Sequence, residues 1–300
     1  MKSVVSYPDR GPWGDAHFRG NCSGRLIVDL VEQFHPKFFV DPMVGSGTTR
    51  EVCEALGVKG WFNDLRYGFN ILADEIPVGG DFGFMHPPYF DVIHYSGEVW
   101  GDKPDPNDLS RCGSYEEFLA KLNEAQFRLY ESLRQGAHMA ILVGDVKRKG
   151  VLYPIQRDMR WYGEPVNLVI KMQHNCWSDR QDYTGKFIAL VHEYLVITRK
   201  PNAWIIPIRV TEMRECDLRR TTVSTWRVVV QGALETLGGQ AELAALYSVV
   251  LDHRKAKEAE QRGQDWRAKV RQTLQRYPDF KPVSRGVWRL VPPGEVATDD

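Results

Sequence analysis

The sequence predicts an α/β domain with a largely parallel sheet, followed by a small helical domain. Three features of the 300 residues lead to this prediction. Short apolar runs alternate with helical patterns between residues 25 and 200, a glycine-rich turn follows the first of these runs, and the pattern becomes helical after residue 225. A chain of this length with 43% hydrophobic residues can bury one large core or two smaller ones.

The first domain is expected to span residues 1–206. Its longest helix is expected at residues 114–136, with Ser114 as the N-cap, Glu117 completing a capping box and Gly136 as a stop. The expected order is helix 25–34, strand 37–40, helix 48–58, strand 59–65, strand 81–85, helix 114–136, and strands 138–146, 165–173 and 193–200. Strands that alternate with helices favour a parallel sheet.

Residues 207–222 are charged and irregular, and we expect a linker there. A compact domain is expected at residues 223–292, with a disordered tail at 293–300. The expected elements of this domain are helices 225–238, 240–254 and 265–277 and a hairpin at 280–291 with Arg285-Gly286 at its turn. Three helices followed by a short hairpin are the layout of a winged helix.

Charge is unevenly distributed along a chain whose formal net charge is zero. From Arg219 to Val291 there are 14 Lys plus Arg against 7 Asp plus Glu, a local excess of +7, so the remainder carries about −7. A basic module attached to an acidic one suggests that the tail meets a polyanion. A solvated helical surface explains the same charge equally well.

The composition contains no sign of secretion, membrane insertion or a metal centre. The opening segment MKSVVSYPDRGPWG lacks the apolar core of a signal peptide, and no run reaches the roughly 18 apolar residues of a membrane span. We therefore expect a soluble, cytoplasmic protein with no membrane partner. The cysteines are odd in number and never spaced CxxC, which argues against a disulfide framework and a zinc site. They are Cys22, Cys53, Cys112, Cys176 and Cys216.

The stretch DPMVGSGTT, residues 41–49, places two glycines between an apolar run and a helical pattern. Gly45 and Gly47 would let a ligand approach the main chain closely, outside the carboxyl end of a strand, where ligands of α/β sheets bind. Asp64, about 23 residues after Asp41, ends the next strand, where an acid commonly binds ribose hydroxyls. No Lys follows Gly47, which argues against a nucleoside triphosphate.

The stretch MHPPYFD, residues 85–91, follows the strand expected at 81–85. Pro87 and Pro88 remove two backbone donors and stiffen the turn, leaving carbonyls that can only accept. A rigid turn rich in acceptors and followed by Tyr89 suits a planar ligand that carries an amino group. In isolation, a proline-rich turn with a packing tyrosine explains the stretch as well.

Together the two motifs resemble those of the S-adenosylmethionine-dependent DNA amino-methyltransferases, which methylate adenine N6 or cytosine N4. The cofactor loop of that family is D-P-F-x-G-S-G-T-T, from which this chain differs at Met43, and its catalytic turn is D/N/S-P-P-Y/F, here HPPY. GNCSGRLIVDLV resembles the family's segment at the methionine end of the cofactor, and HEYLVITRK resembles a late strand. The resemblance covers roughly residues 15–200, in the order of a permuted arrangement.

The resemblance implies a Rossmann-like class I methyltransferase sheet with helices on both faces and S-adenosyl-L-methionine as cofactor. The backbone at Gly45–Gly47 would lie against the methionine part, Asp64 would hold the ribose, and Asp74 or Asp81 would reach the adenine. The implied cofactor-binding residues are Asn21, Ser23, Asp41, Pro42, Gly45, Ser46, Gly47, Thr48 and Asp64. The implied catalytic residues are His86, Pro87, Pro88 and Tyr89.

The chemistry of an exocyclic amine assigns roles to this turn. The amine is a poor nucleophile because its lone pair is delocalised into the base. The carbonyl of Pro87 and the side chain of His86 would accept its hydrogens and free the lone pair, while Tyr89 would stack on a base rotated out of the duplex. A neutral imidazole accepts through one nitrogen and imidazolium through none, so His86 departs from the family pattern. Activity is therefore expected to fall as the pH drops through about 6.5.

The segment WRAKVRQTLQRYPDFKPVSRGVWRL, residues 266–290, resembles the winged-helix modules of restriction-modification enzymes. Arg and Lys on such a helix can contact phosphates and base edges of double-stranded DNA. The implied DNA-binding residues are Arg267, Lys269, Arg271, Gln275 and Arg285, with Arg276 on the same helix. A cognate restriction endonuclease is a candidate partner, and docking to a protein is the alternative for this module.

We therefore expect a site-specific DNA methyltransferase, with adenine N6 preferred over cytosine N4 on base rates alone. Two other functions stay open. An RNA or protein-glutamine methyltransferase uses the same catalytic turn, although the basic winged helix favours duplex DNA. The other is a non-catalytic DNA-binding regulator on a methyltransferase scaffold, against which the complete glycine loop and the intact Pro-Pro-Tyr argue.

Overall fold

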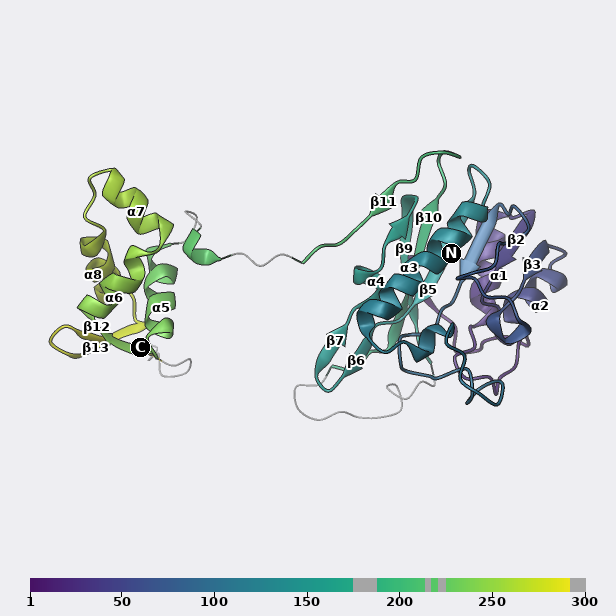
Figure 1. Ribbon diagram of the computed structural model, residues 1–300, viewed down its shortest axis with the longest axis horizontal. Helices are drawn as coiled ribbons and strands as arrows, with labels where there is room; N and C mark the ends of the chain where they lie inside the picture. The colour runs from purple at the N-terminus through teal and green to yellow at the C-terminus, as the bar shows by residue number, and fades with distance from the viewer. Residues whose placement is uncertain (175–187, 214–216, 221–224, 292–300) are drawn as a thin grey trace. The chain divides into compact units, whose positions relative to one another are not determined.

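The computed structural model describes residues 1–174, 188–213, 217–220 and 225–291 (Figure 1). The chain divides into two compact units, Met1–Glu212 and Met213–Asp300. Strand β11 (Ile208–Arg209), in the segment expected to be a linker, pairs with β8 (Trp161–Tyr162) and so belongs to the first unit. The tail expected at 293–300 lies outside the described residues.

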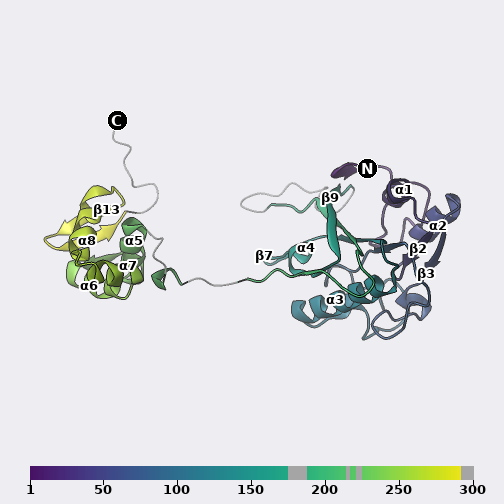
Figure 2. The same cartoon turned by 90° about the horizontal axis from the view of Figure 1, so that it is seen from above.

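The first unit is built on a seven-stranded sheet with the order β1-β9-β10-β5-β4-β2-β3. Strands β9, β2 and β3 of this sheet are labelled in Figure 2. Strand β10 runs antiparallel to both of its neighbours, and the other pairs are parallel. The strands are β1 (Val4–Ser6), β2 (Phe38–Asp41), β3 (Lys59–Phe62), β4 (Phe82–Met85), β5 (His138–Val143), β9 (Glu164–Met172) and β10 (His192–Arg199). The sheet is therefore largely parallel, as predicted.

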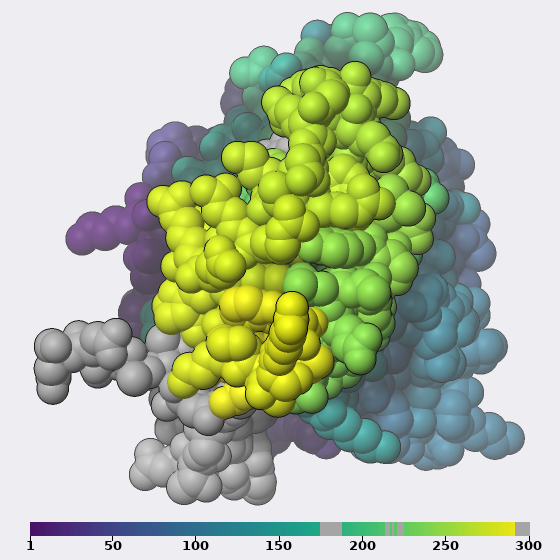
Figure 3. All heavy atoms as spheres, turned by 90° about the vertical axis from the view of Figure 1, so that its left-hand side faces the viewer, coloured from purple at the N-terminus to yellow at the C-terminus, as the bar shows by residue number. Residues whose placement is uncertain are grey.

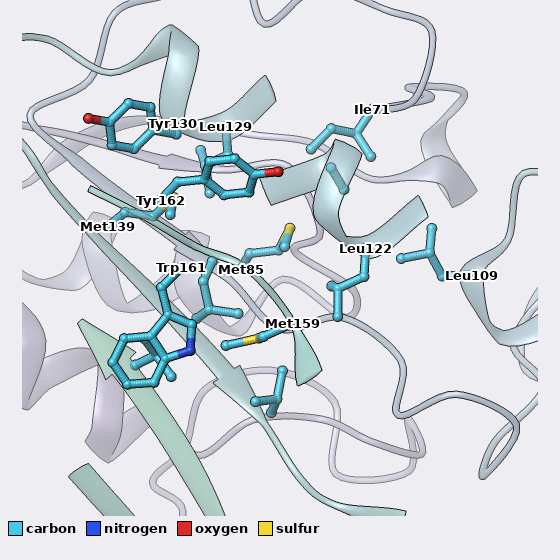
Figure 4. Close-up of a cluster of buried hydrophobic side chains, with 14 of the residues drawn as sticks. Ile71, Met85, Leu109, Leu122, Leu129, Tyr130, Met139, Met159, Trp161 and Tyr162 are labelled. Atoms are coloured by element: carbon cyan, nitrogen blue, oxygen red, sulfur yellow. The ribbon is translucent and has the colours of Figure 1, made fainter. Parts of the chain in front are cut away.

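Helices cover both faces of this sheet because successive strand residues point to opposite sides. On β2, Val40 faces the cluster of α3 (Tyr115–Ser132) and α4 (Ile155–Asp158), part of which is shown in Figure 4. Its neighbour Phe39 faces the cluster of α1 (Gly24–Phe34) and α2 (Thr48–Ala55). The predicted α/β class, with a Rossmann-like sheet between two helical layers, is confirmed.

Two details of α3 differ from the prediction. Ser114 accepts a hydrogen bond from Glu117 N at 3.1 Å, as an N-cap does, but the Glu117 carboxylate accepts from Gly113 N rather than from Ser114 N. The helix ends at Ser132, ahead of the stop expected at Gly136.

Several short elements have no counterpart in the sequence analysis. They are β1, β6 (Val146–Arg148), β7 (Val151–Tyr153), α4, β8, β11 and the 3₁₀ helices Leu65–Tyr67 and Leu109–Arg111. Each has two to four residues, which is too few to display a period from which a sequence pattern could predict them.

The direction in which the chain adds strands to the sheet reverses between β2 and β4. From β2 the chain proceeds to the neighbouring edge strand β3, and then crosses to β4 on the other side of β2. Ligands of open α/β sheets bind at such a switch point, outside the carboxyl ends of the strands. The loops after Asp41 and Met85 both begin there.

The second unit has its own core and its own small sheet, with the order β12-β14-β13. Its elements are α5 (Trp226–Thr236), β12 (Gln240–Glu242), α6 (Leu243–Leu251), α7 (Arg254–Gln261), α8 (Trp266–Arg276), β13 (Phe280–Ser284) and β14 (Val287–Leu290), and Figure 3 shows one face of the unit. The helix expected at 240–254 begins instead with β12, because these residues pair with β14, and α7 was not predicted.

Within residues 1–174, 188–213, 217–220 and 225–291, no helix combines the length and the apolar character that a bilayer crossing needs.

Candidate active site

The glycine loop between β2 and α2 has the open backbone that its sequence predicts. Gly45 and Gly47 have positive φ angles of 54° and 99°, a conformation that favours glycine, and Gly47 is the N-cap of α2. Asp64, after β3, accepts hydrogen bonds from Gly45 N at 2.9 Å and from Arg66 N at 3.0 Å. The end of β3 therefore holds the loop in place.

Two carboxyl groups stand beside this loop in poorly solvated positions. Asp41 is buried at the end of β2 and accepts from Met43 N at 2.9 Å, and burial raises its pKa to about 7. Burial also raises the pKa of Asp64, although its two backbone donors act in the opposite direction.

The segment before α1 folds back onto the loop through Asn21. Thr48 Oγ1, in the first turn of α2, donates to Asn21 Oδ1 at 2.5 Å, and Asn21 Nδ2 donates to Asp15 O at 2.7 Å. Ser23 is the N-cap of α1, and no hydrogen-bond partner is found for its buried hydroxyl in the part of the chain that the structure describes.

A cavity of about 840 Å³, open mouth included, lies over the glycine loop, and we refer to it as the loop cavity. Seven of the nine predicted cofactor-binding residues line it: Asn21, Asp41, Pro42, Gly45, Ser46, Thr48 and Asp64. The lining lacks the other two, Ser23 and Gly47.

The two aspartates suggested for adenine do not line the loop cavity. Asp74 accepts from Asn70 N, and Asp81 accepts from Lys37 N and Phe38 N. The cavity is lined instead by residues that the sequence analysis missed: Phe69, Asn70, Ile71, Asn107 and Asp108. For Phe69, Asn70 and Ile71 the sequence offered one signal, an Asn between two apolar residues shortly after Asp64.

The HPPY turn follows β4 and borders the loop cavity. His86 and Pro88 line that cavity, while His86, Pro87 and Tyr89 line a second, wider depression, the basic hollow. His86 therefore stands where the two spaces adjoin, together with Phe18 and Tyr95, which also line both.

A chain of hydrogen bonds runs from the turn into the sheet. His86 Nε2 lies 2.9 Å from Tyr89 Oη, Tyr89 Oη donates to Glu193 Oε1 at 2.6 Å, and Lys171 Nζ donates to Glu193 Oε2 at 2.5 Å. Glu193 on β10 and Lys171 on β9 are buried and directly opposed in the strand register. We refer to these four residues as the His86 network. The sequence analysis missed Glu193 and Lys171, whose signal was a charge within an apolar strand.

The charges of this network are set by burial and by neighbours. Burial lowers the pKa of His86 to about 4, although Glu193 acts in the opposite direction, so the imidazole is neutral near pH 7. Burial would raise the pKa of Glu193, but the Lys171 ammonium and the donors on Lys171 and Tyr89 hold it below its ordinary range. Burial and Glu193 raise the pKa of Tyr89 well above its ordinary value.

The basic hollow has cationic walls. It is lined by Arg10, Arg19, Lys147, Arg148 and Lys171, against the carboxylates of Asp145 and Glu193. These cations come from the segment before α1, from the β6–β7 hairpin and from β9. The lining therefore has an excess of positive charge beside the HPPY turn.

The five residues expected to contact DNA are all exposed and all belong to the second unit: Arg267, Lys269, Arg271, Gln275 and Arg285. Three of them, 267, 271 and 275, recur every four residues on α8 and so share one face. Arg267 lies over the Trp266 ring at 4.5 Å, Arg271 donates to Tyr247 Oη at 3.0 Å, and Arg285 is in the turn between β13 and β14.

Across the described ranges, no group of three or more His, Cys, Asp or Glu side chains has the arrangement of a metal site.

No protein-family model matches the sequence, and no curated protein matches it either. Among solved structures, TTHA0409 from Thermus thermophilus, provisionally named a DNA modification methylase, is 19% identical over 57% of this chain and 55% of its own, with a TM-score of 0.30. TrmN from Thermus thermophilus is 14% identical over 62% and 51%, with a TM-score of 0.33. The N-methyltransferase NodS from Bradyrhizobium japonicum, in complex with S-adenosyl-L-homocysteine, is 9% identical over 60% and 86%, with a TM-score of 0.32. The chain thus spans about half the length of the first of these structures, and such TM-scores are too low to carry an argument about its function.

Proposed function

We propose that the chain is an S-adenosylmethionine-dependent methyltransferase that modifies an exocyclic amine of a base in DNA, with adenine N6 preferred over cytosine N4. One observation carries the proposal. The glycine loop and the HPPY turn, about 40 residues apart in sequence, border adjoining spaces that share His86. A methyl donor on one side of this residue and an amine on the other would meet there.

The loop cavity fits the cofactor chemically. Bare backbone at Gly45, with Asn21, Ser46 and Thr48 around it, would hold the methionine end. Asp64 already accepts two backbone hydrogen bonds, and a carboxylate has lone pairs left for ribose hydroxyls. The apolar part of the lining, formed by residues such as Phe69 and Ile71, would take the flat adenine.

The chemistry needs an activated amine and a well-placed methyl donor. Bound S-adenosylmethionine would supply a methyl group on a positively charged sulfur: the amine lone pair would form the N–C bond, the electron pair of the C–S bond would stay on sulfur, and the amine would lose one proton to solvent. In this scheme the Pro87 carbonyl and the neutral His86 imidazole accept hydrogen bonds from the amine and localise its lone pair. Tyr89 borders the same space, where a rotated base would stack.

The cationic side chains of the basic hollow and of the second unit support a polyanionic substrate. The basic hollow brings Arg10, Arg19, Lys147 and Arg148 beside the HPPY turn, and cations there would bind phosphates next to the target base. In the second unit, the order helix, strand, helices and hairpin supports a winged-helix module, with α8 and the Arg285 turn as its DNA-binding face. We propose a cognate restriction endonuclease as the partner of such a site-specific methyltransferase.

Nucleotide-resolution sequencing of DNA from cells that express the chain tests the proposal. The expected result is methylation of one base type within one recognition sequence, absent from cells that express the His86→Ala variant. Unmodified DNA, together with transfer of label from S-adenosylmethionine to RNA or protein by the purified chain, would assign a different substrate.

A further inference from the structure

The Tyr89 hydroxyl in the His86 network has a single proton. The group that accepts this proton determines which ring nitrogen of His86 carries a hydrogen. A hydroxyl donates one hydrogen bond and accepts others. Tyr89 Oη lies 2.6 Å from Glu193 Oε1 and 2.9 Å from His86 Nε2, and it can donate to only one of them.

The proton of Tyr89 goes to Glu193, because an ionised carboxylate can only accept. Lys171 Nζ contacts the other oxygen of the same carboxylate at 2.5 Å and keeps the group ionised although it is buried. Two acceptors 2.6 Å apart with no proton between them would repel each other. The Tyr89 oxygen is therefore left as an acceptor toward His86.

His86 Nε2 must then carry a hydrogen, since it faces an oxygen that has no proton left to give. A neutral imidazole has one hydrogen on its two nitrogens, so Nδ1 carries a bare lone pair. Among the described residues, no hydrogen-bond partner of Nδ1 is found. His86 lines both the loop cavity and the basic hollow, so an acceptor on this ring borders both spaces.

We propose that Glu193, held ionised by Lys171 and acting through Tyr89, is a positioning residue that fixes His86 in the Nε2–H tautomer, with Nδ1 as the acceptor offered to the substrate. The identity of the substrate as an amine rests on the proposed function. The tautomer does not rest on it.

The same geometry predicts that Glu193→Gln inverts the tautomer. The Lys171 ammonium requires an acceptor, so the glutamine carbonyl turns to it and the NH₂ group turns to Tyr89. The tyrosine oxygen then accepts from the amide, and its own proton is redirected to His86 Nε2. With Nε2 accepting, the hydrogen of the neutral ring moves to Nδ1 and the free lone pair is lost.

Nitrogen NMR of the ¹⁵N-histidine-labelled full-length protein at pH 7 tests the inference, because protonated and bare ring nitrogens have well-separated shifts. His86 is assigned among the eight histidines by comparison with His86→Asn. The expected result is Nε2–H in the wild type and Nδ1–H in Glu193→Gln. A wild-type spectrum showing Nδ1–H, or an unchanged tautomer in a folded Glu193→Gln variant, would overturn the inference. The wild-type measurement decides even when the variant does not fold.

A matched pair elsewhere in the first unit supplies the control. Tyr7 Oη donates to Asp29 Oδ2 at 2.6 Å, the same kind of bond at the same length, and neither residue lines the two spaces. Asp29→Asn should leave the tautomer of His86 and the rate of methyl transfer unchanged.

Single-turnover methyl transfer separates this inference from the proposed function. Glu193→Gln is expected to lower the rate by about 10²-fold or more, the usual effect of one lost transition-state hydrogen bond, with unchanged affinity for S-adenosylmethionine. A wild type that shows Nε2–H and methylates no DNA refutes the proposed function only. A wild type that methylates DNA, with a Glu193→Gln variant that keeps both rate and tautomer, refutes this inference only.

Discussion

The imidazole of His86 accepts through one nitrogen, and only when it is neutral, unlike the carboxylate or amide that the resemblance leads one to expect at this position, so its neighbours determine whether it works at all. From the sequence alone, an ordinary histidine would charge near pH 6.5 and stop accepting. In the structure, burial moves that pKa to about 4, and Tyr89 determines which nitrogen accepts. The loss of activity expected near pH 6.5 is therefore corrected to a loss near pH 4.

His86 is accordingly predicted to affect the free energy of unfolding and the rate of methyl transfer in different pH ranges. Between about pH 6.5 and 4 the unfolded chain binds a proton at His86 and the folded chain does not, so the contribution of His86 to the free energy of unfolding falls as the pH drops through this window. Asp41, whose pKa burial raises to about 7, contributes with the opposite sign, so the contribution of His86 is read from the difference between the wild type and a variant without the histidine. The single-turnover rate at saturating DNA should stay constant there, since the imidazole that faces Tyr89, Glu193 and Lys171 remains neutral.

His86→Asn is the control for this prediction because asparagine keeps an acceptor and does not titrate. The variant should retain methyl transfer, and in urea unfolding it should lack the part of the pH dependence of the free energy of unfolding that His86 contributes. His86→Ala, in contrast, should lower the rate of methyl transfer by about 10²- to 10³-fold. A wild-type rate that halves near pH 6.5 while the His86→Asn rate does not would contradict the lowered pKa.

Gly45 has a backbone conformation that favours glycine. Its φ of 54° strains any side chain, and a Cβ there would enter the loop cavity within 3.4 Å of Phe18. Gly45→Val should therefore abolish binding of S-adenosylmethionine in calorimetry. Gly57→Val is the matched control, because Gly57 has a φ of 70° with nothing within 4 Å of its Cβ position. Equal affinity in a folded Gly45→Val variant and in the control would remove the loop from the binding site.

Among the elements, those with a strong local signal were predicted and those without one were not. The helical period of α1 and α3 and the apolar strands β2, β4 and β5 depend on neighbours a few residues apart. The strand β12 was mistaken for helix because Gln240–Glu242 extends only through its pairing with β14. Tertiary contact overrode local propensity there.

The N-cap of α3 is Ser114, whose side chain accepts a hydrogen bond from the first turn of the helix. Ser114→Ala removes the acceptor of the Glu117 N–H and should lower the free energy of unfolding of the first unit by about 1 kcal/mol. Ser132→Ala, at the last residue of the same helix, removes a hydroxyl that only donates to Leu129 O and should cost much less. Equal losses for the two variants in urea titrations followed by tryptophan fluorescence would show that the cap adds nothing.

The chain consists of two units, each with its own buried core. The residues that we propose to bind the cofactor and activate the amine are all in the first unit, together with the basic hollow. The exposed arginines and lysine of α8 are in the second. Cofactor binding and most of the DNA affinity should therefore be separable.

A chain that ends at Glu212 is predicted to keep its affinity for S-adenosylmethionine and to lose DNA affinity. Its binding constant for duplex DNA should also depend less steeply on salt concentration, because fewer phosphates are neutralised. Fluorescence anisotropy at several salt concentrations measures both quantities. Full-length protein that carries Arg267→Ala and Arg271→Ala should have a DNA affinity and a salt dependence between those of the full and the shortened chain. Identical affinity and salt slope for the full and shortened chains would mean that the second unit docks a protein.

Local sequence patterns were enough to predict the fold class, the glycine loop and the HPPY turn, because apolar periodicity and the special backbone of glycine and proline act between near neighbours. Only the tertiary structure placed Glu193 beside Tyr89, 104 residues away along the chain, and Lys171 beside Glu193. It also turned Asp74 and Asp81 toward backbone amides rather than toward the loop cavity. A single sequence does not determine such contacts, since they depend on which strands pair and in which register, and it is these contacts that set the charge and the tautomer of His86.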